Sequence, residues 1–404
     1  DSEAGKRGTS IYFPDRVVPM LPKALSNGIC SLNPREDRYT VTAAIAFDRE
    51  GRVTGSTFFP SVIRSRMRLT YEAVEMATVH HEPKIRRKLH DCVLCLDDMA
   101  ELAGLITCVR EKRGSIDFDL PEPEIILDIE GGVSGIIRAE RLNAHRIIEE
   151  FMISANEAVA RFFEERRLSA LFRVHEPPEP EKLRDFERLL RSLGIGHRKL
   201  GTTGALQDVL SEVCGTQYEF IVNRVLLRSM KQARYSARNR GHFGLASESY
   251  LHFTSPIRRY PDLVCHRILK NALEGGKEPV YIEEQLMTMA NHASERERLV
   301  MDAERELEDR VRILHMRDRL GETFQGVISH VTSFGFFVEL TGIFVEGLVL
   351  MSSLVDDYYH FEEERYRITG SRTRKTYRIG DLVTIRVILA DVTSNRLHFE
   401  LYTP

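Results

Sequence analysis

Residues 252–262 read HFTSPIRRYPD, and this stretch governs how the rest of the chain is interpreted. Its two prolines prevent a regular helix, so Arg258 and Arg259 are presented from a constrained segment just before a helix that we expect near Asp262. A rigidly aimed guanidinium binds two phosphate oxygens and stabilises charge that develops on a phosphoryl group. By themselves two arginines are a weak indication of a phosphate site. We expect Asp262 to cap the helix or to pair with an arginine rather than to act as a base.

The charge around this stretch is uneven. The whole chain has a net charge of −3, which argues against a simple polycation. From Arg228 to Lys270, however, nine Lys and Arg stand against two Asp and Glu, a local charge of +7 over 43 residues. A basic surface of that density can neutralise several backbone phosphates. On charge alone, a solvated charged face explains it equally well.

Length and composition describe an ordinary globular protein. With 404 residues, 42% hydrophobic and 29% charged, the chain is too long for one small core and predicts two or three domains. It contains no run of about 18 apolar residues and no signal-peptide pattern. Its six cysteines are sparse, which fits reduced thiols and a cytoplasmic location. Cys92 and Cys95 form one C-x-x-C on a helical pattern; we expect them to pack in a core, with metal binding or redox chemistry as the alternative.

Residues 1–320 predict one large α+β domain with a mixed sheet and many helices. A hairpin is expected over 39–47 and 53–59, and two short strands around Gly131-Gly132. A long helix is expected from Pro83 to Gly114, and another capped by Asn143. Further elements are predicted as a strand over 171–174 and helices over 181–193, 218–234, 262–272 and 282–319.

The last 84 residues change character and predict a separate all-β OB-fold barrel over residues 321–404. Short alternating strands are expected over 324–331, 335–340, 345–351, 382–392 and 396–401, with one long insertion. Barrels of this kind bind single strands by stacking bases on aromatic side chains. The expected stacking surface consists of Phe324, His330, Phe334 and Phe336, whereas Phe337 is expected to fill the barrel.

The complete string over 252–262 resembles the signature of the RNase II/RNase R (RNB) exoribonuclease family. Other stretches resemble the same family: GTSIYFP (8–14), PMLP (19–22), LSNGICSLNP (25–34), LLRSMKQA (226–233) and NRGHFGL (239–245). The tail, with FGFFV (334–338) and GLV (347–349), is similar to the ribosomal-protein-type OB domain that follows the catalytic domain in this family. NRGHFGL and DDYY (356–359) are closer to the RNase R branch than to RNase II. The resemblance covers essentially the whole chain.

The resemblance implies roles for particular side chains. Arg258 matches the arginine that contacts the scissile phosphate, with Arg259 beside it as a further RNA contact. Glu304 matches a carboxylate near the product end, at a position that varies in RNase R-like sequences. The implied contacts to the 3′-terminal nucleotides are the aromatic clamp Tyr12 and Phe118 and the ribose-sensing pair Tyr71 and Glu149. Without the family, Tyr12 is read as strand core, Phe118 as an edge aromatic, and Glu149 and Glu150 as the polar edge of an amphipathic helix.

The family's chemistry implies a cofactor whose ligands the sequence does not contain. The resemblance implies processive 3′→5′ hydrolysis of single-stranded RNA to nucleoside 5′-monophosphates with Mg²⁺. In the family, Mg²⁺ is held by an Asp-x-x-Asp-x-Asp-Asp motif, which is absent from these 404 residues. We therefore assign no metal ligand here and expect the ligands, like the family's cold-shock-type domains, upstream of residue 1. The chain alone is expected to bind RNA and to cleave it poorly or not at all.

Two other classes of function stay open at this point. One is a non-catalytic RNA-binding or regulatory relative whose active site has decayed. The combination of Arg258 with Tyr12 and Phe118 favours the enzyme, since a decayed site has little reason to keep a transition-state arginine. The other is a structural helical protein with an OB appendage, which explains neither the basic segment nor the order of the motifs. The family also suggests a monomer.

Overall fold

In the computed structural model, the described residues are 1–118, 122–128, 132–196, 200–216 and 218–402. The helices of the first part are α1 (Ser2–Arg7), α2 (Tyr71–Thr78), α3 (Pro83–Lys88), α4 (Val93–Arg113), α5 (Asn143–Glu165), α6 (Pro180–Ser192), α7 (Thr203–Val213), α8 (Glu219–Ser229), α9 (Tyr260–Leu273) and α10 (Glu283–Arg317), with a π-helical turn η1 (Ala24–Ile29). Its strands are β1 (Ile11–Tyr12), β2 (Val17–Val18), β3 (Asp37–Phe47), β4 (Val53–Arg64), β5 (Glu122–Leu127), β6 (Val133–Ala139), β7 (Phe172–Val174) and β8 (Arg234–Ser236). Within the described residues, no helix is long and apolar enough to cross a membrane.

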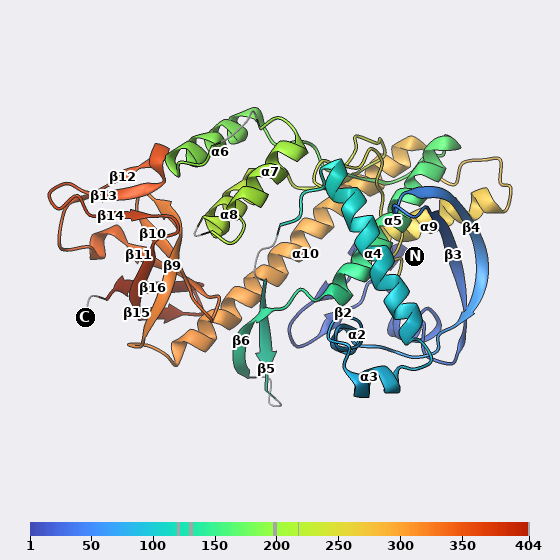
Figure 1. The fold of residues 1–404 in the computed structure, drawn as a ribbon, viewed down its shortest axis with the longest axis horizontal. Helices are drawn as coiled ribbons and strands as arrows, with labels where there is room; N and C mark the ends of the chain where they lie inside the picture. The colour runs from blue at the N-terminus through green and yellow to red at the C-terminus, as the bar shows by residue number, and fades with distance from the viewer. Residues whose placement is uncertain (119–121, 129–131, 197–199, 217, 403–404) are drawn as a thin grey trace.

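The molecule is elongated, with a β-barrel at one end and the β3–β4 hairpin at the other (Figure 1). Helix α10 runs obliquely between the two ends and carries 35 residues, a length of about 50 Å. Its first half contributes Leu286, Ala290 and Ala293 to a core formed with α5, α9 and one face of the hairpin. Its last turns contribute Ile313 and Met316 to a second core, which lies at the barrel end.

The α+β fold class is confirmed, and the predicted hairpins occur as β3–β4 and β5–β6. The expected mixed sheet is different: among the described residues before the barrel, the strands pair as separate two-stranded antiparallel ribbons. Gly131, one of the two glycines around which the second hairpin was predicted, lies outside the described residues. The helix predicted over 218–234 ends at Ser229, and β8 follows it.

The single helix predicted from Pro83 to Gly114 is wrong. Helix α3 ends at Lys88 and α4 begins at Val93, while the apolar spacing continues across the break because both helices pack on the same small core around Ala77. Cys92 lies just before α4 and is partly buried, but Cys95 is exposed, so the prediction that both pack in a core is wrong for Cys95. The predicted end at Gly114 is confirmed, since this residue is left-handed with φ 96°.

Asn143 is the first residue of α5 rather than its cap, which corrects the sequence prediction. The carboxylate of Glu75, on α2, accepts hydrogen bonds from the Asn143 side-chain amide (3.1 Å) and from the backbone N–H of Ala144 (3.0 Å). A carboxylate at this position satisfies free N–H groups and is stabilised by the helix dipole. The cap comes from another helix, so the local sequence could not reveal it.

The predicted OB-type barrel is confirmed as a closed barrel of five strands in the order β10-β11-β16-β15-β9. Its strands are β9 (Thr323–Thr332), β10 (Gly335–Leu340), β11 (Glu346–Leu350), β15 (Leu382–Asp391) and β16 (Arg396–Leu401). The long insertion carries η2 (Met351–Ser353), β12 (Tyr359–Glu362), η3 (Glu363–Arg365), β13 (Arg367–Gly370) and β14 (Thr376–Arg378), and its strands form a three-stranded sheet. The interior of the barrel is continuous with the core of α6, α7 and α8, so both share one set of buried side chains.

Candidate active site and nucleic-acid interface

The segment that carries Arg258 is held by the N-terminal segment of the chain. The backbone carbonyl of Arg258 accepts hydrogen bonds from the Ser10 N–H (2.9 Å) and from the Thr9 hydroxyl (3.0 Å). The Arg258 side chain is exposed and its guanidinium makes no hydrogen bond or ion pair with any described residue. The backbone is therefore fixed while the charged group stays available for a ligand.

Arg259 points the other way, into the protein. Its guanidinium forms two hydrogen bonds with Asp262, from Nε to Oδ2 (2.9 Å) and from Nη2 to Oδ1 (2.7 Å). Asp262 is fully buried and also accepts the Ser255 N–H at 2.7 Å. The expectation that Asp262 pairs with an arginine is thereby confirmed. Burial alone would lower the pKa of Arg259, but Asp262 raises it above its ordinary value. Arg259 thus shapes the loop, and an RNA contact from it stays a prediction.

Acidic groups, most of them from outside the segment, neutralise most of the basic segment 228–270. Glu176 alone pairs with three cations of this segment, and the remaining pairs use Asp1, Glu179, Asp262, Glu274 and Glu283. Of the nine Lys and Arg of this segment, only Arg228 and Arg258 form no side-chain hydrogen bond or salt bridge with a described residue. The expected broad basic surface is therefore reduced to two unpaired guanidinium groups.

Tyr12 and Glu304 lie beside each other although 292 positions separate them. Glu304, on α10, accepts the backbone N–H of Tyr12 through Oε1 at 2.7 Å. The Tyr12 side chain is 47% exposed at the end of the short strand β1. Tyr12 is thus not strand core. The N-terminal segment therefore joins Arg258, through Thr9 and Ser10, to Glu304, through Tyr12.

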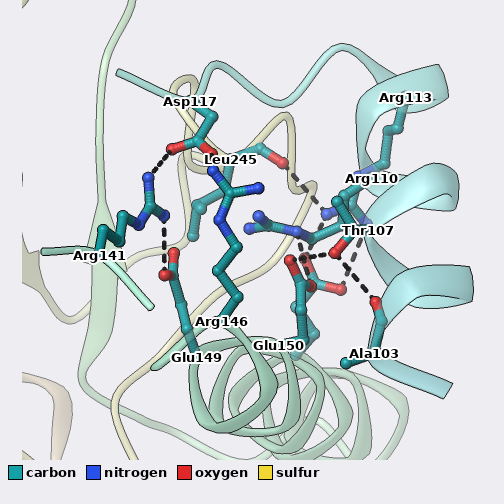
Figure 2. Close-up of polar contacts among 11 residues, drawn as sticks. Ala103, Thr107, Arg110, Arg113, Asp117, Arg141, Arg146, Glu149, Glu150 and Leu245 are labelled. Atoms are coloured by element: carbon teal, nitrogen blue, oxygen red, sulfur yellow. Dashed lines mark hydrogen bonds and ion pairs between the residues drawn. The ribbon is translucent and has the colours of Figure 1, made fainter. Parts of the chain in front are cut away.

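Glu149 and Tyr71 lie near the start of α5. The Tyr71 ring, 43% exposed, stacks on His145 with centroids 4.0 Å apart. Glu149 accepts a hydrogen bond from Arg141 through Oε2 at 2.9 Å (Figure 2). Its neighbour Glu150 is not a polar edge residue: it is 3% exposed and forms an ion pair with Arg110 of α4 at 2.9 Å. Burial raises the pKa of Glu150 although Arg110 opposes this shift.

Phe118 follows a segment that contacts one of the family-like motifs. The Ile116 N–H donates to the carbonyl of Gly244, in the stretch 239–245, at 2.8 Å. Asp117 forms an ion pair with Arg141 at 2.7 Å. Phe118 itself is partly buried against the core of α6 to α8. It is thus not a free edge aromatic, and its role in an RNA clamp stays a prediction.

The outward-facing aromatic side chains of the barrel match the prediction except that Phe337 replaces Phe336. Phe336 is fully buried and stacks on Tyr377, so its assignment to the RNA-binding surface is wrong. Phe337, which was expected to fill the barrel, instead points outward, stacks with His330 and contacts the ring of Phe334. Phe334 is 54% exposed and Phe324 is partly buried. Side chains of a barrel strand alternate between the inside and the outside, so the predicted assignments of these two adjacent phenylalanines are reversed.

A groove of about 950 Å³ lies between α8, α10 and the barrel. It reaches from Phe337 and His398 on the barrel to Glu304 on α10, the residue that accepts the Tyr12 N–H. Sequence reasoning did not assign its cationic lining: Arg224, Arg228, Arg305, Arg312 and Arg396. Burial lowers the pKa of Arg228. An anion beside this desolvated and unpaired arginine would stabilise its charged form.

Two family models match the chain and show the family to which it belongs. The RNB domain model matches residues 1–275, and the S1 RNA binding domain model matches residues 317–401. The chain belongs to the RNB family. This confirms the resemblance that the motifs indicated. The division of the chain at residue 320 stays a prediction.

Curated relatives in the RNB family carry the name Ribonuclease R. The protein of Aquifex aeolicus is 44% identical over 99% of this chain and 57% of its own length. The protein of Escherichia coli is 40% identical over 99% of this chain and 51% of its own length. The chain therefore spans about half the length of the curated relatives it matches.

Solved structures share this fold. Mycoplasma genitalium RNase R in complex with ribose-methylated single-stranded RNA superposes with a TM-score of 0.91 at 32% identity, covering 100% of this chain and 64% of that chain. Yeast Ssd1, described as a pseudonuclease, superposes with a TM-score of 0.72 at 18% identity, covering 91% and 45%. At that identity the likeness shows the fold alone, so the RNB fold by itself does not separate nucleases from non-catalytic relatives.

The described residues do not supply the metal centre that the RNB family implies. They contain no group of three or more His, Cys, Asp or Glu side chains placed to hold a metal ion. Glu304, the carboxylate expected near the reaction, is occupied by the Tyr12 N–H. The donor set does not fit Mg²⁺, which requires several oxygen ligands. No chemical step through a metal is derived from these residues.

Four partly buried histidines are expected to make the stability of this RNB domain depend on pH. Burial lowers the pKa of His175, His252 and His266, and that of His242 to about 3. These groups are neutral in the folded state but protonate near pH 6.5 when unfolded. Stability from a depressed histidine pKa is present above 6.5 and is lost as the pH falls below it. We therefore expect the free energy of unfolding to fall between pH 7 and pH 5, by up to about 1.4 kcal/mol per pH unit for each such histidine.

Urea denaturation at several pH values measures this dependence. His242→Asn should flatten the slope because it removes one buried titrating group, whereas the same change at the exposed His90 should leave the slope unchanged. Equal slopes for the wild type and His242→Asn would contradict the prediction.

Proposed function

We propose that this protein is a 3′→5′ exoribonuclease that degrades single-stranded RNA processively to nucleoside 5′-monophosphates with Mg²⁺. One observation carries the proposal: the N-terminal segment 9–12 joins Arg258 to Glu304. It binds the Arg258 carbonyl through Thr9 and Ser10 and reaches Glu304 through the N–H of Tyr12. A phosphate-binding cation, a base-stacking ring and a carboxylate are therefore assembled from three distant parts of the chain.

The proposed path for RNA follows the groove between the barrel and α10. Aromatic rings on the barrel, Phe334 and Phe337 with His330, offer stacking surfaces at its outer end. Arg228 and Arg396, which have no hydrogen-bond or ion-pair partner among the described residues, offer contacts to phosphates along its length. Stacking combined with a cationic groove binds any base sequence but needs unpaired bases, which favours single strands.

We assign the contacts at the 3′ end to the side chains that the resemblance indicated. Arg258 would stabilise charge on the scissile phosphate, since its backbone is held by Thr9 and Ser10 and its guanidinium has no partner among the described residues. Tyr12 and Phe118 would stack on the terminal bases, and Tyr71 with Glu149 would contact the ribose. We also propose a monomer in the cytoplasm. The free state of all six cysteines supports a reducing compartment.

A nuclease assay with 5′-labelled single-stranded RNA and Mg²⁺ tests the activity. The complete product of the gene is expected to release nucleoside 5′-monophosphates from the 3′ end without populating intermediates. The 404-residue chain alone is expected to bind the RNA and to degrade it poorly, because its described residues hold no carboxylate cluster. Mg²⁺-dependent stepwise degradation by the chain alone would contradict that expectation.

The alternative of a non-catalytic RNA-binding relative has a separate signature. The chain shares its fold with Ssd1, which is described as a pseudonuclease, so the fold is compatible with this alternative. It predicts that the complete gene product binds RNA and leaves it intact. If neither the complete gene product nor the 404-residue chain binds RNA, both the exoribonuclease and the non-catalytic RNA-binding relative are ruled out.

Phe337→Ala is expected to weaken binding of single-stranded RNA by the 404-residue chain about fivefold or more, because a stacked base contributes roughly 1–3 kcal/mol. Fluorescence anisotropy with a labelled oligonucleotide measures the dissociation constant. Tyr358→Ala is the matched control, since Tyr358 is an exposed aromatic on the insertion and outside the groove. Wild-type affinity in Phe337→Ala would show that this face of the barrel does not bind RNA.

A further inference from the structure

Arg141 bridges two segments that carry predicted RNA contacts. It lies between β6 and α5, and its side chain is 30% exposed. Its Nη1 donates to Asp117 Oδ1 at 2.7 Å, and its Nη2 donates to Glu149 Oε2 at 2.9 Å. Figure 2 shows the guanidinium between the two carboxylates, one directly before Phe118 and the other on α5.

The bridge leaves one oxygen of Glu149 available. Arg141 engages Oε2, and no described residue makes a hydrogen bond or ion pair with Oε1. A carboxylate oxygen only accepts hydrogen bonds, so the free Oε1 is suited to a hydroxyl donor such as a ribose 2′-OH. Holding the other oxygen fixes the direction in which Oε1 points. Deoxyribose lacks this donor.

The opposite end of the bridge controls the Phe118 segment. That segment has a backbone anchor, the hydrogen bond from Ile116 to Gly244, and Asp117 links it to α5 by hydrogen bonds through Arg141 and by a longer ion pair, at 3.9 Å, with Arg146 of α5. Burial alone would lower the pKa of Arg141, but its hydrogen bonds with Asp117 and Glu149 raise it above the ordinary value. The guanidinium therefore keeps its charge, and a planar two-armed donor sets the distance between both carboxylates.

We propose that Arg141 is a positioning residue that sets the discrimination between RNA and DNA at the 3′ end, by holding Glu149 and the Phe118 segment in a fixed relation. This inference rests on the proposed function, since it assigns the ribose contact to Glu149. Without Arg141, Asp117 and Glu149 face each other as like charges and move apart. Glu149, which would accept the hydrogen bond of the 2′-hydroxyl, and the Phe118 ring are then no longer held at a fixed separation.

Binding of matched RNA and DNA decamers to the 404-residue chain tests the proposal without requiring turnover. Arg141→Ala is expected to lower the ratio of RNA to DNA affinity about tenfold, the effect of losing one hydrogen bond to a charged group. Arg141→Lys should lower the ratio similarly, because an ammonium keeps the charge but lacks the two-armed geometry. Arg146→Ala is the matched control: Arg146 approaches the same Asp117 at only 3.9 Å and should keep the wild-type ratio.

The possible outcomes separate this inference from the proposed function. Equal losses of RNA and DNA affinity, or full rescue by lysine, would show that Arg141 acts as a general charge and overturn the inference alone. A wild-type chain without any preference for RNA would also overturn it. A wild-type chain that binds no RNA would overturn the proposed function first. If circular dichroism shows that Arg141→Ala is unfolded, Asp117→Ala removes one end of the bridge instead, and an unchanged affinity ratio in that variant overturns the inference.

Discussion

Arg258→Ala is expected to reduce hydrolysis of single-stranded RNA by about 100-fold or more in the complete gene product, because a hydrogen-bond donor at a developing charge contributes that much. RNA affinity is expected to fall less than about tenfold, since one phosphate contact among several is lost. The measurements are single-turnover release of labelled mononucleotide and anisotropy of the same oligonucleotide.

The structure explains why turnover and affinity should separate. The Arg258 backbone is held by Thr9 and Ser10, so truncating the side chain leaves the loop in place. The guanidinium has no protein partner among the described residues, so no buried charge is left unpaired by its removal. The variant therefore reports the function of the guanidinium rather than the stability of the fold.

A second arginine of the basic segment provides the control for Arg258. Arg238 pairs on the surface with Glu283, and both side chains are largely exposed. An exposed pair contributes little, so Arg238→Ala should keep turnover and stability near wild type. If Arg258→Ala retains full turnover, the assignment of Arg258 to the scissile phosphate is wrong.

Asp262→Ala is expected to lower the free energy of unfolding by roughly 3–5 kcal/mol, the usual cost of removing one partner of a buried ion pair. The change leaves the guanidinium of Arg259 buried without its counter-charge and the Ser255 N–H without its acceptor. A loss of this size is a large fraction of the 5–15 kcal/mol that typically stabilises a domain. Urea denaturation followed by circular dichroism measures it.

Two further variants identify the cause of that loss. Glu274→Ala removes an exposed acid just past the end of the same helix, α9, and should cost less than about 0.5 kcal/mol. The double variant Arg259→Met/Asp262→Leu replaces the pair by apolar side chains and should recover part of the stability, because no unpaired charge remains. A cost below about 1 kcal/mol for Asp262→Ala would mean that the pair does not hold the loop.

The motifs were sufficient to predict the fold because their order along the chain is specific. The β3–β4 hairpin and the five barrel strands also follow from alternation and turn residues, which are local signals. The exchange of Phe336 and Phe337 could not be predicted, since two adjacent phenylalanines fit either parity of the strand. The pairing register of β10 with β9 and β11 decides which ring is inside.

Contacts between distant segments account for the remaining errors. The basic segment 228–270 seemed strongly charged because its counter-ions, Glu176 above all, lie outside it in sequence. The buried pair Arg110–Glu150 joins two helices, and neither residue has a local pattern that marks it as buried. Arg141 was missed for the same reason. Its importance depends on two carboxylates that lie 24 and 8 positions away.

The shared core between the barrel and helices α6 to α8 has a thermodynamic consequence. Side chains such as Ile313 and Met316 belong at once to α10 and to the apolar interior that continues into the barrel. Arg224 of α8 adds an ion pair to Glu346 of the barrel at 2.7 Å. A cut at residue 320 would therefore expose apolar surface on both fragments. We therefore expect the barrel and helices α6 to α8 to unfold together as one cooperative unit, and a barrel exchanged by itself to lose stability.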